Sequence, residues 1–169
     1  MKKFILFITI LFTLLHTTFL HLQNKTTTHD SIQKSLATKI IRFHVIGNSN
    51  SSLDQNVKLE IKNNILDYLK PLLDNSNDIS YSRKLIQTNL KQISHIAQKT
   101  LAKYNLNYSV NTNLTTSFFP KKQYGDMTLP AGKYEAVRIK LGNAYGKNWW
   151  CVLYPSLCFV DSTYSVLPS

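Results

Sequence analysis

The first hydrophobic block of the chain is the uncharged run Phe4–Asn24, which follows two lysines. A helix over Phe4–Leu22 would be about 28 Å long, just enough to span the hydrocarbon layer of a membrane. Basic residues before an apolar segment are typical of an export signal, because the lysines stay on the cytoplasmic side. The pattern therefore predicts a signal peptide or signal anchor over residues 1–24, cleaved or uncleaved, and a polar linker over 25–38. A buried core helix is the alternative.

The next part of the chain shows first a strand pattern and then a helix pattern. The β-branched run Ile40–Ile46 ends at a Gly-Asn pair and predicts a buried strand. Apolar positions every three or four residues predict two amphipathic helices after it. The first begins at an N-cap, Ser51, and ends at about Leu69, and the second covers about Ser80–Tyr104.

Two segments in the second half of the chain alternate with the period of a strand. Tyr108–Phe118 predicts a strand that is wet on one side, and Glu135–Leu141 predicts another. The whole order predicts an α+β fold: a small mixed sheet with two long amphipathic helices packed on one face, plus the N-terminal signal or anchor helix. We expect one domain over residues 39–161 and a short tail over 162–169.

The interpretation of the net charge depends on whether the chain is exported. The 169 residues include 20 Lys and Arg against 9 Asp and Glu, a formal net charge of +11. A basic cytoplasmic protein would suggest nucleic acid. Outside the membrane the available polyanions are lipid headgroups, cell-wall polymers and acidic protein surfaces, so no nucleic-acid partner is expected.

The second predicted helix carries a basic stripe opposite its apolar face. A solvated helix face is one interpretation of this stripe, and a docking surface for an anionic partner is the other. Its members are Lys84, Lys91, His95 and Lys99.

The two cysteines, Cys151 and Cys158, lie seven positions apart. If Trp150–Leu153 and Ser156–Val160 form a hairpin, the cysteines face each other at about 4.5–5.5 Å between Cα atoms, which suits a disulfide. Two free, packed thiols are the alternative, and a metal or catalytic role is a further one. A zinc site would need two more ligands, and no histidine has a suitable spacing, so no metal or cofactor is expected.

Signals for catalysis are weak. The five glycines form no dinucleotide or P-loop motif, and neither G-x-S-x-G nor H-E-x-x-H occurs. A cysteine could pair with His44 or His95 as a nucleophile. His44, however, lies in an apolar strand, where a histidine bonded to backbone is the ordinary state. The chain is therefore predicted not to be an enzyme.

Exposed aromatics on a rigid loop often anchor a protein partner. The segment from Tyr124 to Gly132 predicts a structured loop with glycines that allow positive φ. Core packing is the alternative for its tyrosine and for the two tryptophans. The candidate partner contacts are His44, Asn48, Tyr124, Asp126, Pro130, Gly132, Trp149 and Trp150.

Three segments together resemble one known family. IRFHVIGNSN (Ile41–Asn50), YGDMTLPAGKYEAVRI (Tyr124–Ile139) and GKNWWCVLYPSLCFVD (Gly146–Asp161) are similar, in the same order, to the stage II sporulation protein R family. The similarity covers about residues 40–161. The chain departs from the usual family pattern at Gly47, Asn50, Lys133 and Ser156, and many relatives continue further past the CFVD motif.

The resemblance implies an exported signalling protein with no known catalytic residues. Such a protein is made in the forespore and sent into the space between the forespore and mother-cell membranes, anchored or released. There it would activate a membrane-embedded aspartic protease, stage II sporulation protein GA, which cuts pro-sigma-E. The alternatives are an exported cell-wall hydrolase with a cysteine nucleophile and an anchored adhesin that uses the basic helix face.

Overall fold

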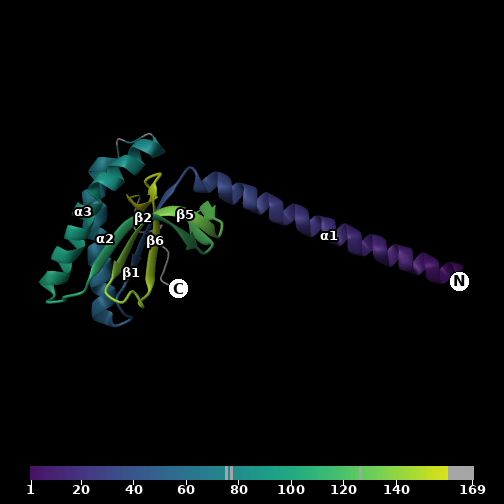
Figure 1. The fold of residues 1–169 in the computed structure, drawn as a ribbon, viewed down its shortest axis with the longest axis horizontal. Helices are drawn as coiled ribbons and strands as arrows, with labels where there is room; N and C mark the ends of the chain where they lie inside the picture. The colour runs from purple at the N-terminus through teal and green to yellow at the C-terminus, as the bar shows by residue number, and fades with distance from the viewer. Residues whose placement is uncertain (75, 77, 126, 160–169) are drawn as a thin grey trace. The chain divides into compact units, whose positions relative to one another are not determined.

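The computed structural model describes residues 1–74, 76, 78–125 and 127–159, without the side chains of residues 22–30 and 159. It divides into two compact units, Met1–Leu36 and Ala37–Ser169. Helix α1, Lys2–Ala37, makes up nearly all of the first unit (Figure 1), so residues 25–37 of the predicted linker are helical. Within the described residues, Lys2–His21 is the segment whose length and composition would suffice to cross a membrane. This is the N-terminal apolar helix that the hydrophobic pattern predicts.

The second unit is built on a mixed sheet of four strands, in the order β2-β5-β1-β6. Central strand β1 is parallel to β5 and antiparallel to β6, and β2 is antiparallel to β5. A two-stranded hairpin, β3 and β4, forms a separate small sheet. The strands are β1 Ile41–Ile46, β2 Val110–Phe119, β3 Lys122–Tyr124, β4 Met127–Leu129, β5 Gly132–Leu141 and β6 Asn148–Tyr154.

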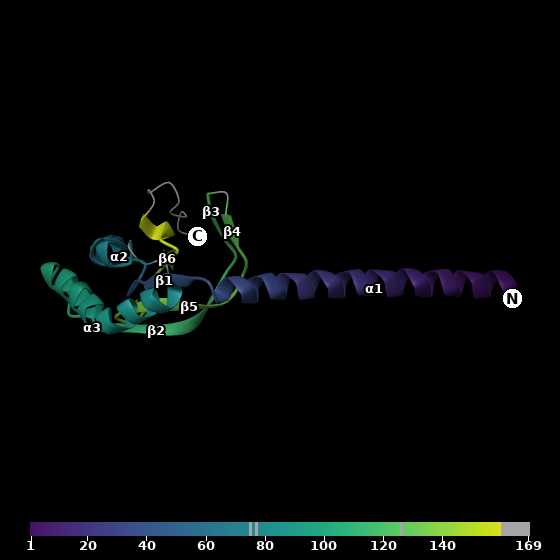
Figure 2. The ribbon, with the colours of Figure 1, turned by 90° about the horizontal axis from the view of Figure 1, so that it is seen from above.

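Two helices, α2 (Ser52–Leu73) and α3 (Ile79–Lys103), follow β1. The Ser51 hydroxyl accepts a hydrogen bond from the Asp54 amide, which confirms the predicted N-cap. The helix continues through Pro71 to Leu73, four residues beyond the predicted end. In Figure 2 both helices lie on one side of the sheet and the β3-β4 hairpin lies on the other, so the predicted α+β architecture is confirmed.

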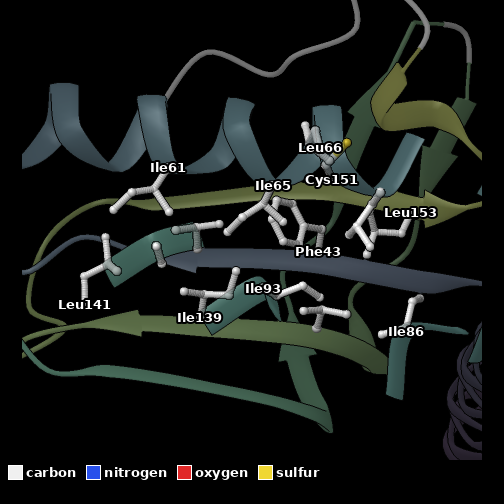
Figure 3. Packing of buried hydrophobic residues seen from close by; sticks show 14 of the residues in the cluster. Phe43, Ile61, Ile65, Leu66, Ile86, Ile93, Ile139, Leu141, Cys151 and Leu153 are labelled. Carbon is white, nitrogen blue, oxygen red and sulfur yellow. The ribbon is translucent and has the colours of Figure 1, made fainter. Parts of the chain in front are cut away.

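The main core lies between the helices and the sheet, on what we call the helix face. Figure 3 shows Phe43 of β1 and Ile139 of β5 pointing toward Ile61, Ile65 and Leu66 of α2. These side chains are at most 9% exposed. The apolar stripes of both helices thus meet the odd-numbered positions of β1 and β5, as the alternation in Glu135–Leu141 predicts.

Strand β2 corrects one detail of the predicted pattern. Phe118 was expected on the same side as Val110 and Leu114, which pack against the core. Its register with Lys133 keeps Phe118 on that side, but its side chain is 65% exposed, near the end of the strand and outside the core cluster. The next residue, Phe119, is fully buried on the opposite face, which the sequence pattern predicts to be solvent-exposed.

The C-terminal part of the described chain contains a disulfide but no second hairpin. After β6 the chain turns into a short 3₁₀-helix, η1 (Leu157–Phe159), so the predicted strand over Ser156–Val160 is wrong for the part that is described. A turn replaces it, in which the Leu157 amide donates to the Pro155 carbonyl. Cys151 and Cys158 are nevertheless bonded, with their Cα atoms 5.6 Å apart.

Candidate functional site

The face of the sheet opposite the helices carries polar side chains in a regular order. We call it the hairpin face, because β3 and β4 pack on it. Strand register aligns Asn113 of β2 with Arg138 of β5, Arg138 with His44 of β1, and His44 with Trp150 of β6. These four residues form a line across all four strands, which we call the polar row. The alternation of a half-polar strand places them there, because side chains two residues apart share a face.

Each member of the polar row has a buried polar atom without a hydrogen-bond partner in the described part of the chain. These atoms are Asn113 Oδ1, Arg138 Nε, His44 Nδ1 and Trp150 Nε1. Native proteins leave few such atoms unpaired, because each costs about 1–3 kcal/mol when buried. Four of the nine such atoms found in the described residues lie in this one line.

His44 is held in place by its neighbours. Its Nε2 lies 2.7 Å from Asn148 Oδ1, and its side chain is only 8% exposed. Burial lowers the pKa of His44, and the Asn148 hydrogen bond opposes this shift without reversing it, while the charge of Arg138 lowers the pKa further. The ring is therefore neutral at pH 7. With Nε2 donating to Asn148, Nδ1 is an acceptor.

A buried guanidinium lies beside the polar row. Arg42 of β1 is fully buried and forms no ion pair with any described residue. Its Nη2 donates to the Tyr124 hydroxyl at 2.6 Å, while Nε and Nη1 have no partner in the described chain. Its Cζ lies 4.0 Å from the Phe119 ring centroid and 5.2 Å from that of Tyr134. The aromatic rings thus compensate part of the desolvation, and burial lowers the pKa of this guanidinium.

The β3-β4 hairpin closes this aromatic site. Tyr124 of β3 and Leu129 of β4 have buried side chains. The Tyr134 hydroxyl donates to the Pro130 carbonyl at 2.7 Å. Lys122 Nζ lies 4.8 Å from the Trp150 ring centroid. The hairpin therefore connects the aromatic site around Arg42 to the end of the polar row.

The electrostatics of the hairpin face are one-sided. Arg42, Arg138, Lys140 and Lys122 contribute positive charge to it. Glu135 of β5 points to the opposite face, where it pairs with Arg83 of α3 at 2.8 Å. Among the described residues of the strands and the hairpin, no carboxylate offsets these charges on the hairpin face.

The predicted contact residues separate into two groups. His44, Tyr124 and Trp150 come together on the hairpin face, with Pro130 and Gly132 where the hairpin joins β5. Asp126 lies outside the described residues. Trp149 lies on the helix face, packed against the core, with Lys62 Nζ 4.3 Å from its ring centroid.

Asn48, another predicted contact, belongs to a structural clasp at the end of β1. Its Oδ1 accepts from the Asn143 amide and its Nδ2 donates to Asp54. Gly142 has a φ of +54°, and a Cβ there would meet Asn48 Oδ1 at 2.3 Å, so glycine is needed at that position. The clasp joins the β1-α2 loop to the β5-β6 loop, and Asn48 is engaged within it.

Lys58 lies beneath this clasp. It is 2% exposed, and its Nζ donates to Gln55 Oε1 at 2.6 Å and to the Lys147 carbonyl at 2.9 Å. Burial lowers its pKa to about 8, with a smaller contribution from the charge of Lys147.

The basic stripe is solvent-exposed along α3. Its four members, Lys84, Lys91, His95 and Lys99, are all exposed. His95 and Lys99 also line a groove of about 460 Å³ between α2 and α3, together with Asp67 and Asn64. A carboxylate thus lies within that groove, in contrast to the hairpin face.

Sequence reasoning missed several residues of the site: Arg42, Asn113, Phe119, Tyr134 and Arg138. One signal was available, because an arginine inside an apolar β-branched run must either be paired or surrounded by aromatic rings. Nothing in the local sequence could show which strands would be neighbours. The alignment of Asn113 with Arg138 depends on a pairing between residues that are 25 positions apart.

The structure bears on two alternative interpretations, a cysteine nucleophile and a metal site. Both cysteines are joined in the disulfide, so neither sulfur is a thiolate that could act as a nucleophile. Among the described residues, no group of three or more His, Cys, Asp or Glu side chains could hold a metal ion. What distinguishes the hairpin face is its positive charge, which no described carboxylate of the strands offsets.

Comparisons with known proteins agree with the arrangement of the chain. The sequence model for "Stage II sporulation protein R (spore_II_R)" matches residues 37–164. Stage II sporulation protein R of Bacillus subtilis (strain 168) is 35% identical over 163 residues, which cover 95% of this chain and 73% of that protein. No solved structure matches the chain.

Proposed function

The chain belongs to the stage II sporulation protein R family, and from this premise we propose that it activates a membrane-embedded aspartic protease of the stage II sporulation protein GA type. Membership makes it a sporulation signalling protein. The finer proposal is that activation occurs in trans and leads to processing of pro-sigma-E. The observation that carries it is the family match over 37–164, which covers the whole sheet and both helices that pack on it.

The N-terminal helix supports the proposed location. Lys2–His21 is apolar, long enough to cross a membrane, and exposed along its length. We propose that it directs export of the rest of the chain from the forespore into the intermembrane space, where the folded unit is either anchored or released. An export segment followed by a binding domain is what a signal between two membranes requires.

Activation needs no chemistry from this chain. A ligand shifts a two-state protein toward the form that it binds better. A difference of about 3 kcal/mol between the active and inactive forms of the protease would change their ratio more than a hundredfold. The hairpin face, with a positive charge that no described carboxylate of the strands offsets, is the surface we propose for such selective binding.

Reconstitution tests this proposal. The full chain, the protease and pro-sigma-E would be combined in lipid vesicles, and cleavage would be followed by gel electrophoresis. We expect cleavage to depend on the chain and to saturate with its concentration. Cleavage at the same rate without the chain would contradict the activator role. A protease with its catalytic aspartate replaced is the control for unrelated proteolysis.

A further inference from the structure

We propose that helix α3 binds the surface of an anionic lipid bilayer through its exposed basic stripe. The binding needs only the chain and the lipid. Its purpose rests on the proposed function, because it would hold the folded unit at a membrane surface, where a membrane-embedded protease is met. The members of the stripe are Lys84, Lys91, His95 and Lys99, and all four side chains are exposed.

Helix α3 carries charge of one sign. Its 25 residues, Ile79–Lys103, include five Arg and Lys and no Asp or Glu. Two of these five, Arg83 and Lys103, pair with carboxylates of other elements. The remaining three form no ion pair with any described residue, although Asp67 of α2 lines the groove beside one of them. They are the lysines of the stripe, Lys84, Lys91 and Lys99.

The stripe is a nearly straight line on the outer side of the helix. At 100° per residue, its members and Tyr81 lie within about 80° of one another, opposite the buried Ile86 and Ile93. From Lys84 to Lys99 the line is about 22 Å long at 1.5 Å per residue. Figures 1 and 2 show α3 at the edge of the second unit. A row of charges on such a convex edge can touch a flat surface along its whole length.

The side chains of this face suit a layer of lipid headgroups. Tyr81 lies three residues before Lys84 on the same side and is 54% exposed. Tyrosine rings concentrate at membrane interfaces, because the ring is apolar and the hydroxyl is polar. The apolar stems of the lysines can lie against the interface while their ammonium groups reach the phosphates.

The N-terminal helix indicates that the anionic partner is a bilayer. Lys2–His21 is long and apolar enough to cross a membrane. A chain inserted by this segment keeps its second unit close to that membrane, so even weak contacts have a high effective concentration of lipid. The stripe also contains no arginine, whose planar fork fits one fixed carboxylate. Lysine ammonium groups are flexible point charges, which suit mobile phosphates.

Binding through α3 would leave the hairpin face free. The two helices lie on one side of the sheet and the β3-β4 hairpin lies on the other, as Figure 2 shows. A unit that rests on a bilayer by its α3 stripe therefore does not cover the face that we propose for the protease. The stripe and the hairpin face can thus be occupied at the same time.

Lysine labelling on the full chain tests this inference. The chain would be placed in nanodiscs of phosphatidylcholine, with or without phosphatidylglycerol, and acetylation of each lysine would be followed by mass spectrometry. We expect anionic nanodiscs to slow labelling of the three stripe lysines by about threefold or more. About 0.5 M salt should restore it, because the Debye length falls to about 4 Å. Exposed lysines outside α3 serve as internal controls and should keep their labelling rates: Lys70, Lys121 and Lys147.

Matched double variants test whether the stripe acts as a unit. Lys84→Gln with Lys91→Gln removes two charges from the stripe, and Lys70→Gln with Lys121→Gln removes two exposed charges elsewhere. Each basic residue near an anionic surface multiplies the affinity about fivefold, so the stripe variant should bind roughly 25-fold more weakly. Protection of Lys99, which both variants retain, should be lost in the stripe variant and kept in the control. Thermal unfolding would verify that both variants are folded.

Three results would overturn the inference. The first is equal labelling of the stripe in neutral and anionic nanodiscs, and the second is equal loss of Lys99 protection in the two variants. The third is protection in neutral nanodiscs by polyglutamate or polyphosphate, at the same concentration of negative charge, as strong as that given by the anionic lipid. That result would assign the stripe to an acidic protein or a wall polymer.

The protease is absent from this experiment, so its outcome is separate from the cleavage assay. Chain-dependent cleavage without lipid protection of the stripe would reject the bilayer contact and leave the activator role intact. Lipid protection without chain-dependent cleavage would reject the activator role and leave the bilayer contact.

Discussion

The two faces of the four-stranded sheet carry different kinds of buried side chain. The helix face buries aliphatic and aromatic side chains against α2 and α3, where Trp149 Nε1 is a buried polar atom without a described partner. The hairpin face buries Arg42 and His44 instead, and it holds most of the buried, unpaired polar atoms of the described chain. The comparison teaches that apolar packing is concentrated on one face and buried polar groups on the other.

The largest effect should come from the helix face. Phe43→Ala removes a fully buried ring at the centre of the core and should lower the free energy of unfolding by about 3–5 kcal/mol. Urea denaturation at pH 7, followed by circular dichroism, measures this change. Phe118→Ala is the matched control, because its ring is 65% exposed, and it should shift stability by no more than about 0.5 kcal/mol. Equal losses would contradict the placement of Phe43 in the core and of Phe118 outside it.

The disulfide should come next. It joins Cys151 on β6 to Cys158 within η1, and both pack against the helix-face core. Replacing both cysteines by serine opens a loop of eight residues and should cost about 2.5 kcal/mol on the chain-entropy estimate. A reductant should lower the wild type to the level of the variant and leave the variant unchanged. A wild type that ignores the reductant would contradict this contribution.

A change of opposite sign is expected on the hairpin face. Arg42→Met replaces a buried, unpaired cation by an apolar side chain of similar length and should raise the free energy of unfolding by about 1 kcal/mol or more. Arg83→Met is the control, because it breaks a half-exposed ion pair and should lower stability by about 0–1 kcal/mol. Under the proposed function, the Arg42 variant should also activate the protease less well. A destabilised Arg42→Met would show that the aromatic rings fully compensate the buried charge.

The effect that is smallest at neutral pH comes from the titration of His44. Burial lowers the pKa of His44 in the folded state, so the unfolded chain takes up a proton below about pH 6.5 that the folded chain does not. Stability should therefore fall as the pH decreases from 7 toward 5, by at most about 1.4 kcal/mol per pH unit from this group. The groups that face the ring are Asn148, Trp150, Phe119 and the cations Arg138, Arg42 and Lys140.

His44→Gln tests this dependence. The variant should have a flatter stability profile between pH 5 and 7 in urea titrations, since it removes the titrating ring. His95→Gln, at an exposed position on α3, serves as the control and should keep the slope of the wild type. A slope that survives His44→Gln would assign the pH dependence to other groups.

Local sequence patterns predicted the helix face well, because its rules are local. The N-cap at Ser51, the two amphipathic stripes and the alternation of Glu135–Leu141 each depend on neighbours within four residues. The predicted end of α2, at about Leu69, precedes Pro71, whereas the helix continues through Pro71 to Leu73. The hairpin face was only partly predicted. His44, Tyr124 and Trp150 were identified as candidates, but Asn113 and Arg138 depend on strand pairing that no local pattern encodes.

The order of the strands has a consequence for how the polypeptide acquires its structure. β1 is made early, yet its hydrogen-bonding partners on both sides are β5 and β6, about a hundred residues later in sequence. Pairings of such long range form slowly and only when both ends of the loop are present. During export, β1 would therefore cross the membrane before its neighbours β5 and β6 have crossed. The topology itself delays folding until translocation is nearly complete.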